Sequence, residues 1–390
     1  MHLKKTVAVI CLLAWVFSQP VLAGEQLVSV EYVVLENSGG TISYPRLIRH
    51  PDQVVMDTVN QAVVSLAQIN GHIGTLSTLE GGEPGGLTLT SKAKVYAASE
   101  GADVLTVLVE ASGKMPNGRP GVQVTPMMFD LENGALIASE DIFADVALAQ
   151  DAIDSYLEDC ILDELSDYLD ASMLTPVPLD SVLADDVGLT FYYPVDDILF
   201  LSGKPAAVQF HYHEIRDLLD LSPGSLLSRM GIGEAAFLPS LESAGMIKAA
   251  CAEGVLPGVP AKLGDDLAAL IEQYKMPIDS EAFPGANKYQ LEDAAFRKTW
   301  LVSSGDEDTG CVEGIVSCRI NLFGLITGIT PRETCLAVLG EGTALPLDEA
   351  SAALYGFAPG TLDLYIVGSH QLALNHDEQQ VLASVWLSMP

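Results

Sequence analysis

The sequence predicts an α+β fold in which mixed or antiparallel sheets pack against helices. Some stretches, such as 87–98 and 102–111, are as long as a typical strand and either alternate between apolar and polar residues or are mostly apolar. Turn residues separate them. Other stretches, such as 52–70 and 145–169, carry apolar residues at helical spacing. Two N-terminal units and a small C-terminal module each combine both patterns, which is typical of α+β proteins.

Composition excludes several functions. Of the 390 residues, 49% are apolar, which is enough to build buried cores rather than a disordered acidic tail. Lys and Arg number 19 against 52 Asp and Glu, a formal net charge of −33. Nucleic-acid phosphates and anionic membrane surfaces both attract basic proteins, so neither is expected as a partner.

The first 23 residues predict a signal peptide. Met1–Lys5 is short and basic, and Thr6–Phe17 is apolar but shorter than a membrane span. Val21–Ala23 fits a peptidase site, with cleavage after Ala23. We therefore expect a secreted or extracytoplasmic protein without a transmembrane anchor. Loss of Lys4 and Lys5 leaves 17 basic and 52 acidic residues, a net charge of −35.

The first expected domain covers residues 24–115. Strands are predicted at 26–36 and 41–48, and Pro45 suggests an edge position in the second of them. A helix follows over 52–70, starting after Pro51 and stopping at Gly71. Its apolar residues step by four, three, four and three, at Val55, Val59, Ala62, Leu66 and Ile69. Strands at 87–98 and 102–111 complete the domain.

The second expected domain covers residues 116–220. A strand at 122–131 precedes a long helix at 145–169, then strands at 189–193 and 206–212 and a helix at 214–219. Residues 221–297 predict a connecting region of short helices and loops. Six prolines interrupt it, namely Pro223, Pro239, Pro257, Pro260, Pro277 and Pro284.

The C-terminal α+β module is expected over 298–390. Residues 298–303 and 314–322 predict strands. Thr330 through Glu333 predicts a capping box, with Pro331 at the first helical position, and Gly340 is the stop signal. Further strands are predicted at 361–366 and 381–389.

Two motif-bearing stretches resemble a pair of bacterial extracellular domains of unknown function. One is Phe129–Gly134 continuing to Glu140–Phe143; the other is Leu189–Pro194 leading to Val208–Ile215. Such domains occur in the ectodomain of the lysozyme-sensing anti-sigma factor and in the accessory region of peptidoglycan deacetylases. The resemblance covers about half the chain, over 26–220. It implies an α+β fold and a binding role, with a basic, lysozyme-like protein as one possible partner class.

The sequence also departs from that family. Members often carry a Gly-Ala-His-Gly element before the Phe-Asp strand, whereas Gly113–Gly121 here contains no His. The deacetylase catalytic motifs are missing. The C-terminal module is similar, more weakly, to small envelope modules through Gly328-Ile329-Thr330 and Leu339-Gly340.

Five cysteines remain after signal cleavage, at Cys160, Cys251, Cys311, Cys318 and Cys335. Cys311 and Cys318 are close in sequence, so we expect a disulfide between them. Cys160 lies on the apolar side of the helix at 145–169 and is expected to be a buried thiol. No Cys-x-x-Cys spacing is present, which argues against a zinc ribbon or thioredoxin-type motif.

His211, His213 and Glu214 are candidate metal ligands. In a strand the two imidazoles share one face, and a carboxylate follows directly. The competing interpretation is a strand edge with solvent-facing histidines. No catalytic residues and no cofactor are expected.

We therefore expect a secreted, non-catalytic binding or sensor-like protein of the bacterial cell envelope that recognises a wall ligand or an extracellular protein, for example a basic, lysozyme-like one. Two alternatives stay open. One is a metal-dependent peptidoglycan or polysaccharide hydrolase using His211 and His213. The other is an envelope assembly or structural factor.

Overall fold

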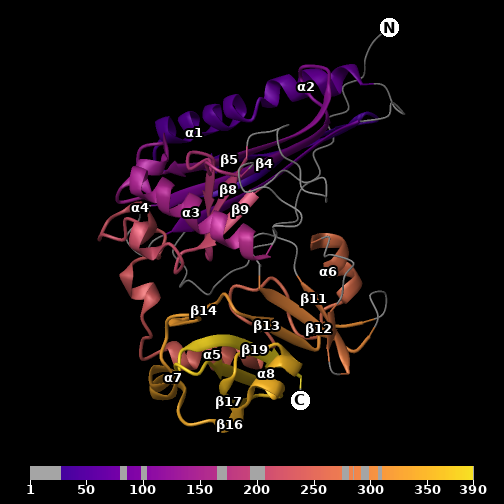
Figure 1. Ribbon diagram of the computed structural model, residues 1–390. Coiled ribbons are helices and arrows are strands. Elements are labelled where there is room, and N and C mark those ends of the chain that lie inside the picture. Colours follow the sequence, from indigo (N-terminus) through magenta and orange to yellow (C-terminus); the bar gives the residue numbers. More distant parts are fainter. Residues whose placement is uncertain are drawn as a thin grey trace.

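The computed structural model describes residues 28–79, 86–97, 103–164, 174–193, 207–274, 281–283, 285–290, 298–305 and 310–389. The expected signal peptide lies outside these ranges. The chain forms two halves, each built on a β-sheet covered by helices (Figure 1). The predicted α+β fold class is confirmed.

A six-stranded sheet forms the N-terminal half. Its strand order is β1 (Ser29–Asn37), β2 (Gly40–Arg49), β3 (Leu87–Ala97), β4 (Asp103–Lys114), β5 (Pro120–Asp130) and β6 (Ala135–Leu136). All pairs are antiparallel except β2 with β3, which pair in parallel only over Gly40–Ile42. The predicted edge position is wrong, because β2 lies between β1 and β3. Pro45 is tolerated there because it lies beyond the stretch that pairs with β3 and pairs only with β1.

Two helices, α1 (Gln53–Leu66) and α2 (Ile69–Thr78), cover one face of this sheet (Figure 1). Asp52 caps α1 by accepting a hydrogen bond from the Val54 backbone N–H. The predicted single helix over 52–70 is wrong at its end. The helix breaks at Ala67 and Gln68, and the chain then turns helical again through Gly71 to Thr78.

Gln68 sits at the break with φ of 49°, in the left-handed region. A side chain there is strained by about 1 kcal/mol relative to glycine. We expect Gln68→Gly to raise the free energy of unfolding by about 0.5–1 kcal/mol. Urea denaturation measures this difference, with Gln68→Ala as the control. If the glycine variant is no more stable than the alanine variant, the break does not store this strain.

The other face of the sheet packs against α3 (Val146–Glu164) and a second, three-stranded sheet. That sheet has the order β7 (Val182–Ala184), β8 (Gly188–Tyr192) and β9 (Ala207–His211). Phe191, Phe210 and Ile153 are fully buried between these layers. The predicted boundary at 115/116 falls in the hairpin between β4 and β5, which pair along their whole length, so it does not separate two units.

Residues 212–242 run along the N-terminal half and lead to the C-terminal half. They include the 3-10 helix η3 (Arg216–Leu218), the short helix α4 (Leu226–Arg229) and the 3-10 helix η4 (Glu234–Phe237). Arg229 donates two hydrogen bonds to the Asp130 carboxylate, 3.0 and 2.9 Å long, which ties α4 to the end of β5.

An eight-stranded sheet forms the C-terminal half, and every described pairing in it is antiparallel. A separate pair, β14 (Asn321–Leu322) and β15 (Leu325–Ile326), follows β13. The order of the large sheet is β10 (Glu281–Phe283), β11 (Ala286–Gln290), β12 (Thr299–Ser303), β13 (Gly314–Ser317), β19 (Leu382–Ser388), β18 (His370–His376), β17 (Gly360–Val367) and β16 (Thr343–Leu347).

Helices lie against this sheet. One core contains buried residues of α5 (Ser243–Ala252), α6 (Leu267–Tyr274) and α7 (Arg332–Leu339). A smaller cluster contains Ala352 of α8 (Glu349–Tyr355) together with Phe357 and Ala373. Because α5, α6, β10 and β11 belong to this half, it begins well before the predicted boundary at residue 298.

The predicted capping box at Thr330 and Glu333 is wrong. Pro331 takes the N-cap position of α7 without a side-chain hydrogen bond, and Thr330 Oγ1 instead accepts from the Ile326 backbone N–H. The predicted end at Gly340 is confirmed. Gly340 has a φ of 84°, in the region that favours glycine.

The predicted Cys311–Cys318 disulfide is not formed in the structure, where both cysteines are free thiols. Strand β13 runs between them, and an extended strand rises about 3.3 Å per residue. The two ends of such a segment lie too far apart for the Cα separation of about 4–7 Å that a disulfide needs. Cys251 and Cys335 are free and buried, and the side chain of Cys160 lies outside the described residues.

Candidate functional site

A pocket of about 620 Å³ lies between the two halves of the chain. The N-terminal half contributes the end of β9 and the segment around η4. The C-terminal half contributes the start of α5, the loop 257–260 and the residues that follow β13. A pocket of this size at the junction of two folded units is a typical place for a ligand.

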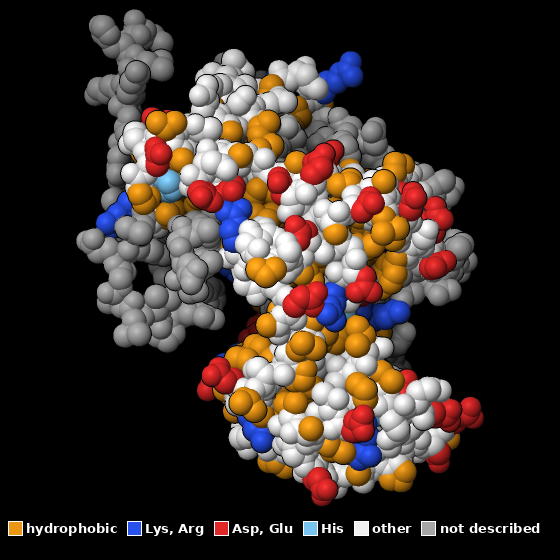
Figure 2. Space-filling view, turned by 90° about the vertical axis from the view of Figure 1, so that its left-hand side faces the viewer, with side chains coloured by type: hydrophobic (Ala, Val, Ile, Leu, Met, Phe, Trp, Pro, Cys, Tyr) orange, Lys and Arg blue, Asp and Glu red, His pale blue; other side chains and the backbone are white. Residues whose placement is uncertain are grey.

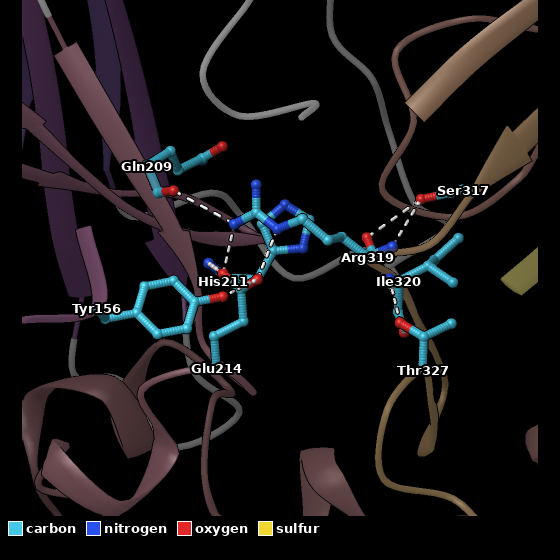
Figure 3. A network of polar contacts seen from close by, with 8 residues as sticks. All are labelled: Tyr156, Gln209, His211, Glu214, Ser317, Arg319, Ile320 and Thr327. Atoms are coloured by element: carbon cyan, nitrogen blue, oxygen red, sulfur yellow. Dashed lines mark hydrogen bonds and ion pairs between the residues drawn. The ribbon is translucent and has the colours of Figure 1, made fainter. Parts of the chain in front are cut away.

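A buried ion pair crosses the junction next to the pocket (Figure 3). Arg319, just after β13, donates to Glu214, just after β9, through Nε at 2.5 Å and also through Nη2. Nη2 lies 3.4 Å from the backbone carbonyl of Gln209, on β9 itself. The two charged side chains are only 7% and 8% exposed. Arg319 therefore links the C-terminal half to β9 and to the turn after it, where the predicted site residues lie.

The electrostatics of Glu214 follow from this pairing. Burial acts to raise the pKa of its carboxyl, but the hydrogen bonds and charge of Arg319 outweigh burial and hold that pKa at about 2. The carboxylate also accepts a 2.9 Å hydrogen bond from the His211 backbone N–H. Glu214 is thus ionised at neutral pH and held by groups of the chain itself.

The structure brings the three predicted metal ligands together, but Glu214 pairs with Arg319 and the two histidine rings contact each other. The rings of His211 and His213 lie 5.4 Å apart, edge to face, and both residues are buried. Glu214 is bound to a guanidinium, which disfavours a cation beside it. Across the described residues, no group of three or more His, Cys, Asp or Glu side chains is placed to hold a metal ion. The solvent-facing interpretation of the two histidines is wrong.

A second ion pair borders the pocket. Asp186 lines the pocket and pairs with Lys94 of β3, and both side chains are largely exposed. The neighbouring Asp185 accepts backbone hydrogen bonds from Val187 and Gly188 at 2.7 and 2.9 Å. The ionisable groups Asp186, Glu214 and Arg319 are therefore all engaged within the chain.

The apolar wall of the pocket is held in place by close backbone packing. Gly324 has a φ of 95°, and a Cβ there would lie 2.3 Å from the backbone of Leu238 and Pro239. Ser243 at the start of α5 donates a 2.7 Å hydrogen bond to the Phe323 carbonyl. Only glycine at position 324 permits the close approach to the backbone of Leu238 and Pro239. The wall formed by 238–243 is thereby fixed against the turn at 323–324.

Sequence reasoning missed Arg319 and the apolar wall. Arg319 is 105 residues from Glu214, so no local spacing could connect them. One signal was available: Arg319 is one of only 19 basic residues and lies between apolar stretches. A cation in such a position needs a buried partner.

His213 provides a test through pH. Burial lowers the pKa of its imidazole below 6.5, so below pH 6.5 the unfolded chain binds more protons than the folded one. The stability contributed by neutral His213 is complete above pH 6.5 and is lost as the pH falls. As the pH falls from about 7.5 to 5, we expect the free energy of unfolding of His213→Gln to decrease less steeply than that of the parent. The two slopes should differ by at most about 1.4 kcal/mol per pH unit.

Urea titrations at a series of pH values measure these slopes. His50→Gln is the matched control, because His50 is only half-buried and lies beside Asp52, whose backbone N–H donates to its Nδ1. Equal slopes for the parent and His213→Gln would show that His213 is not held neutral by burial.

Comparisons with known proteins give structural neighbours and no family assignment. No family model matches the chain, and no curated protein matches it. A DUF3298-family structure from Bacteroides fragilis is 15% identical with a TM-score of 0.36, covering 52% of this chain and 97% of that one. A DUF3298-family structure from Pseudomonas aeruginosa is 13% identical with a TM-score of 0.33, covering 50% and 94%.

A DUF4309-family structure from Bacillus subtilis is 14% identical with a TM-score of 0.28, covering 39% of this chain and 98% of that one. Similarity at this level does not place the chain in either family. Within the described residues, no helix has both the length and the apolar character needed to cross a bilayer.

Proposed function

We propose that the chain is an exported, non-catalytic binding protein of the cell envelope whose acidic surface recognises its partner. The partner would be an extracellular protein or a component of the wall. The resemblance of 26–220 to the ectodomain of the lysozyme-sensing anti-sigma factor supports a protein partner.

The state of the ionisable groups at the pocket carries this proposal. General acid–base catalysis needs a group whose proton can move near neutral pH. Glu214 is held ionised by Arg319, with a pKa of about 2, and Asp186 is paired with Lys94, so both carboxylates are engaged within the chain. His211 and His213 also line the pocket, and burial lowers the pKa of the His213 ring. The pocket therefore resembles a site that holds a ligand more than one that reacts with it.

The charge of the chain favours a basic partner. Acidic side chains are spread over both halves on the face shown in Figure 2. The expected mature chain carries a net charge of −35. Such a surface attracts cationic proteins and accelerates their encounter.

The binding test uses two proteins of similar fold and opposite charge, hen lysozyme and α-lactalbumin, over immobilised mature protein. We expect lysozyme to bind at about 20 mM salt and to bind much more weakly at about 0.5 M, where charges are screened within about 4 Å. α-Lactalbumin should not bind under either condition. Co-sedimentation with purified peptidoglycan sacculi tests the wall ligand. Failure of both lysozyme and sacculi to bind would overturn the proposed function.

Catalysis is tested separately with peptidoglycan and chitooligosaccharides. We expect no soluble product from either substrate. Turnover that is lost in His211→Ala or His213→Ala would establish the hydrolase alternative instead.

A further inference from the structure

We propose that the pocket binds a small, uncharged and mostly apolar ligand, such as an aromatic or short acyl compound. This inference goes beyond the proposed function: the protein or wall partner meets the acidic surface, and the pocket is a second site with its own chemistry. The ligand is identified by the pocket walls, its volume and its charges.

The walls of the pocket are mainly apolar. Ile232 and Phe237 from the N-terminal half are fully or nearly buried and face it from one side. Val259, Ile320 and Phe323 line it from the C-terminal half. A volume of about 620 Å³ falls within the range of sites for drug-sized molecules and exceeds that of a single side chain.

The charges at the pocket disfavour an ionised ligand. Among the described lining residues, Arg319 carries the one guanidinium or ammonium group, and it donates to Glu214 and to the Gln209 carbonyl. An anionic ligand would have to compete with a carboxylate already seated on that guanidinium. A cationic ligand would lose hydration in an apolar site whose acidic groups are already paired.

The polar groups at the pocket can orient a neutral ligand. His213 stays uncharged at neutral pH, because burial lowers the pKa of its ring. A neutral imidazole offers one donor and one acceptor. Asn321 is fixed by a 3.1 Å hydrogen bond to the Ala236 carbonyl across the junction.

The edge of the pocket is apolar as well. Leu238 and Met246 line it and are 59% and 38% exposed. Leu241, between them in sequence, is fully exposed. An apolar molecule would therefore meet apolar surface on its way in.

Two dyes that share one framework test the proposal. N-phenyl-1-naphthylamine is uncharged, and 8-anilino-1-naphthalenesulfonate adds a sulfonate to the same rings. We expect the uncharged dye to bind the mature protein with one-to-one stoichiometry, at least about tenfold more tightly than the sulfonate. Equal or tighter binding of the sulfonate would show that the pocket recognises anions.

Ala236→Trp places an indole in the pocket wall, and Ala353→Trp makes the same change on the exposed surface of α8, outside the pocket. We expect the first variant to lose dye binding by about tenfold or more and the second to bind like the parent. Circular dichroism establishes that both variants are folded. Unchanged binding to Ala236→Trp would overturn the inference.

The dye and lysozyme experiments fail independently. If lysozyme or sacculi bind but the uncharged dye does not, the inference about pocket chemistry is overturned and the proposed function stands. If the dye binds in the pocket but neither lysozyme nor sacculi binds, the proposed function is overturned.

Discussion

Arg319→Met is expected to lower the free energy of unfolding by about 3–5 kcal/mol. The substitution keeps most of the side-chain volume but removes the guanidinium that pairs with Glu214. Glu214 is then left ionised and 8% exposed without its cation. Because Arg319 and Glu214 come from different halves, we also expect the junction to loosen, which urea denaturation and limited proteolysis of the segment 230–242 would detect.

The surface pair Arg216–Glu234 gives the matched control, since its side chains are 36% and 60% exposed. Arg216→Met should cost no more than about 1 kcal/mol. The double variant Glu214→Met with Arg319→Met removes both charges and should recover much of the lost stability. Equal costs for Arg319→Met and Arg216→Met would show that the crossing pair is not a buried link.

Phe210→Ala is expected to destabilise the N-terminal half by about 3–5 kcal/mol. The Phe210 ring is fully buried in β9 and packs edge to face against Phe191 at 6.0 Å and Tyr156 at 5.6 Å. Removing it leaves a cavity next to the strand that carries His211. We therefore expect the variant to bind the uncharged dye more weakly as well as to unfold earlier.

Leu354→Ala is the control for Phe210→Ala, because the Leu354 side chain is 57% exposed on α8. It should change stability by no more than about 0.5 kcal/mol. Thermal and urea unfolding measure both variants. A loss below about 1 kcal/mol for Phe210→Ala would contradict the packing of β9 and α3 against the six-stranded sheet.

Local signals in the sequence were sufficient for most strands and for the long helix. The stretches at 87–98, 102–111 and 122–131 correspond to β3, β4 and β5 within a few residues. The break between α1 and α2 was missed because Gln68, not glycine, adopts the left-handed conformation. Strand pairing across the 115/116 hairpin was missed because Gly and Pro mark a tight turn and a domain boundary in the same way.

The candidate site was only half predictable. Two histidines two residues apart in a strand share a face, and on that basis His211 and His213 were predicted to lie together. They do lie together, but β9 ends at His211 and His213 lies in the following turn. Their environment could not be predicted, since it comes from Arg319 and the wall near Phe323 in the other half of the chain. The Cys311–Cys318 prediction failed because closeness in sequence ignores the extended strand between them.

The most direct test of the pocket as a ligand site is hydrogen exchange of the mature protein with and without saturating N-phenyl-1-naphthylamine. The dye should slow exchange in the pocket-forming segments 231–246 and 257–260, and in 319–323, while amides of α1 and α8 exchange as before. Protection confined to segments outside the pocket, or no protection at saturation, would contradict the assignment.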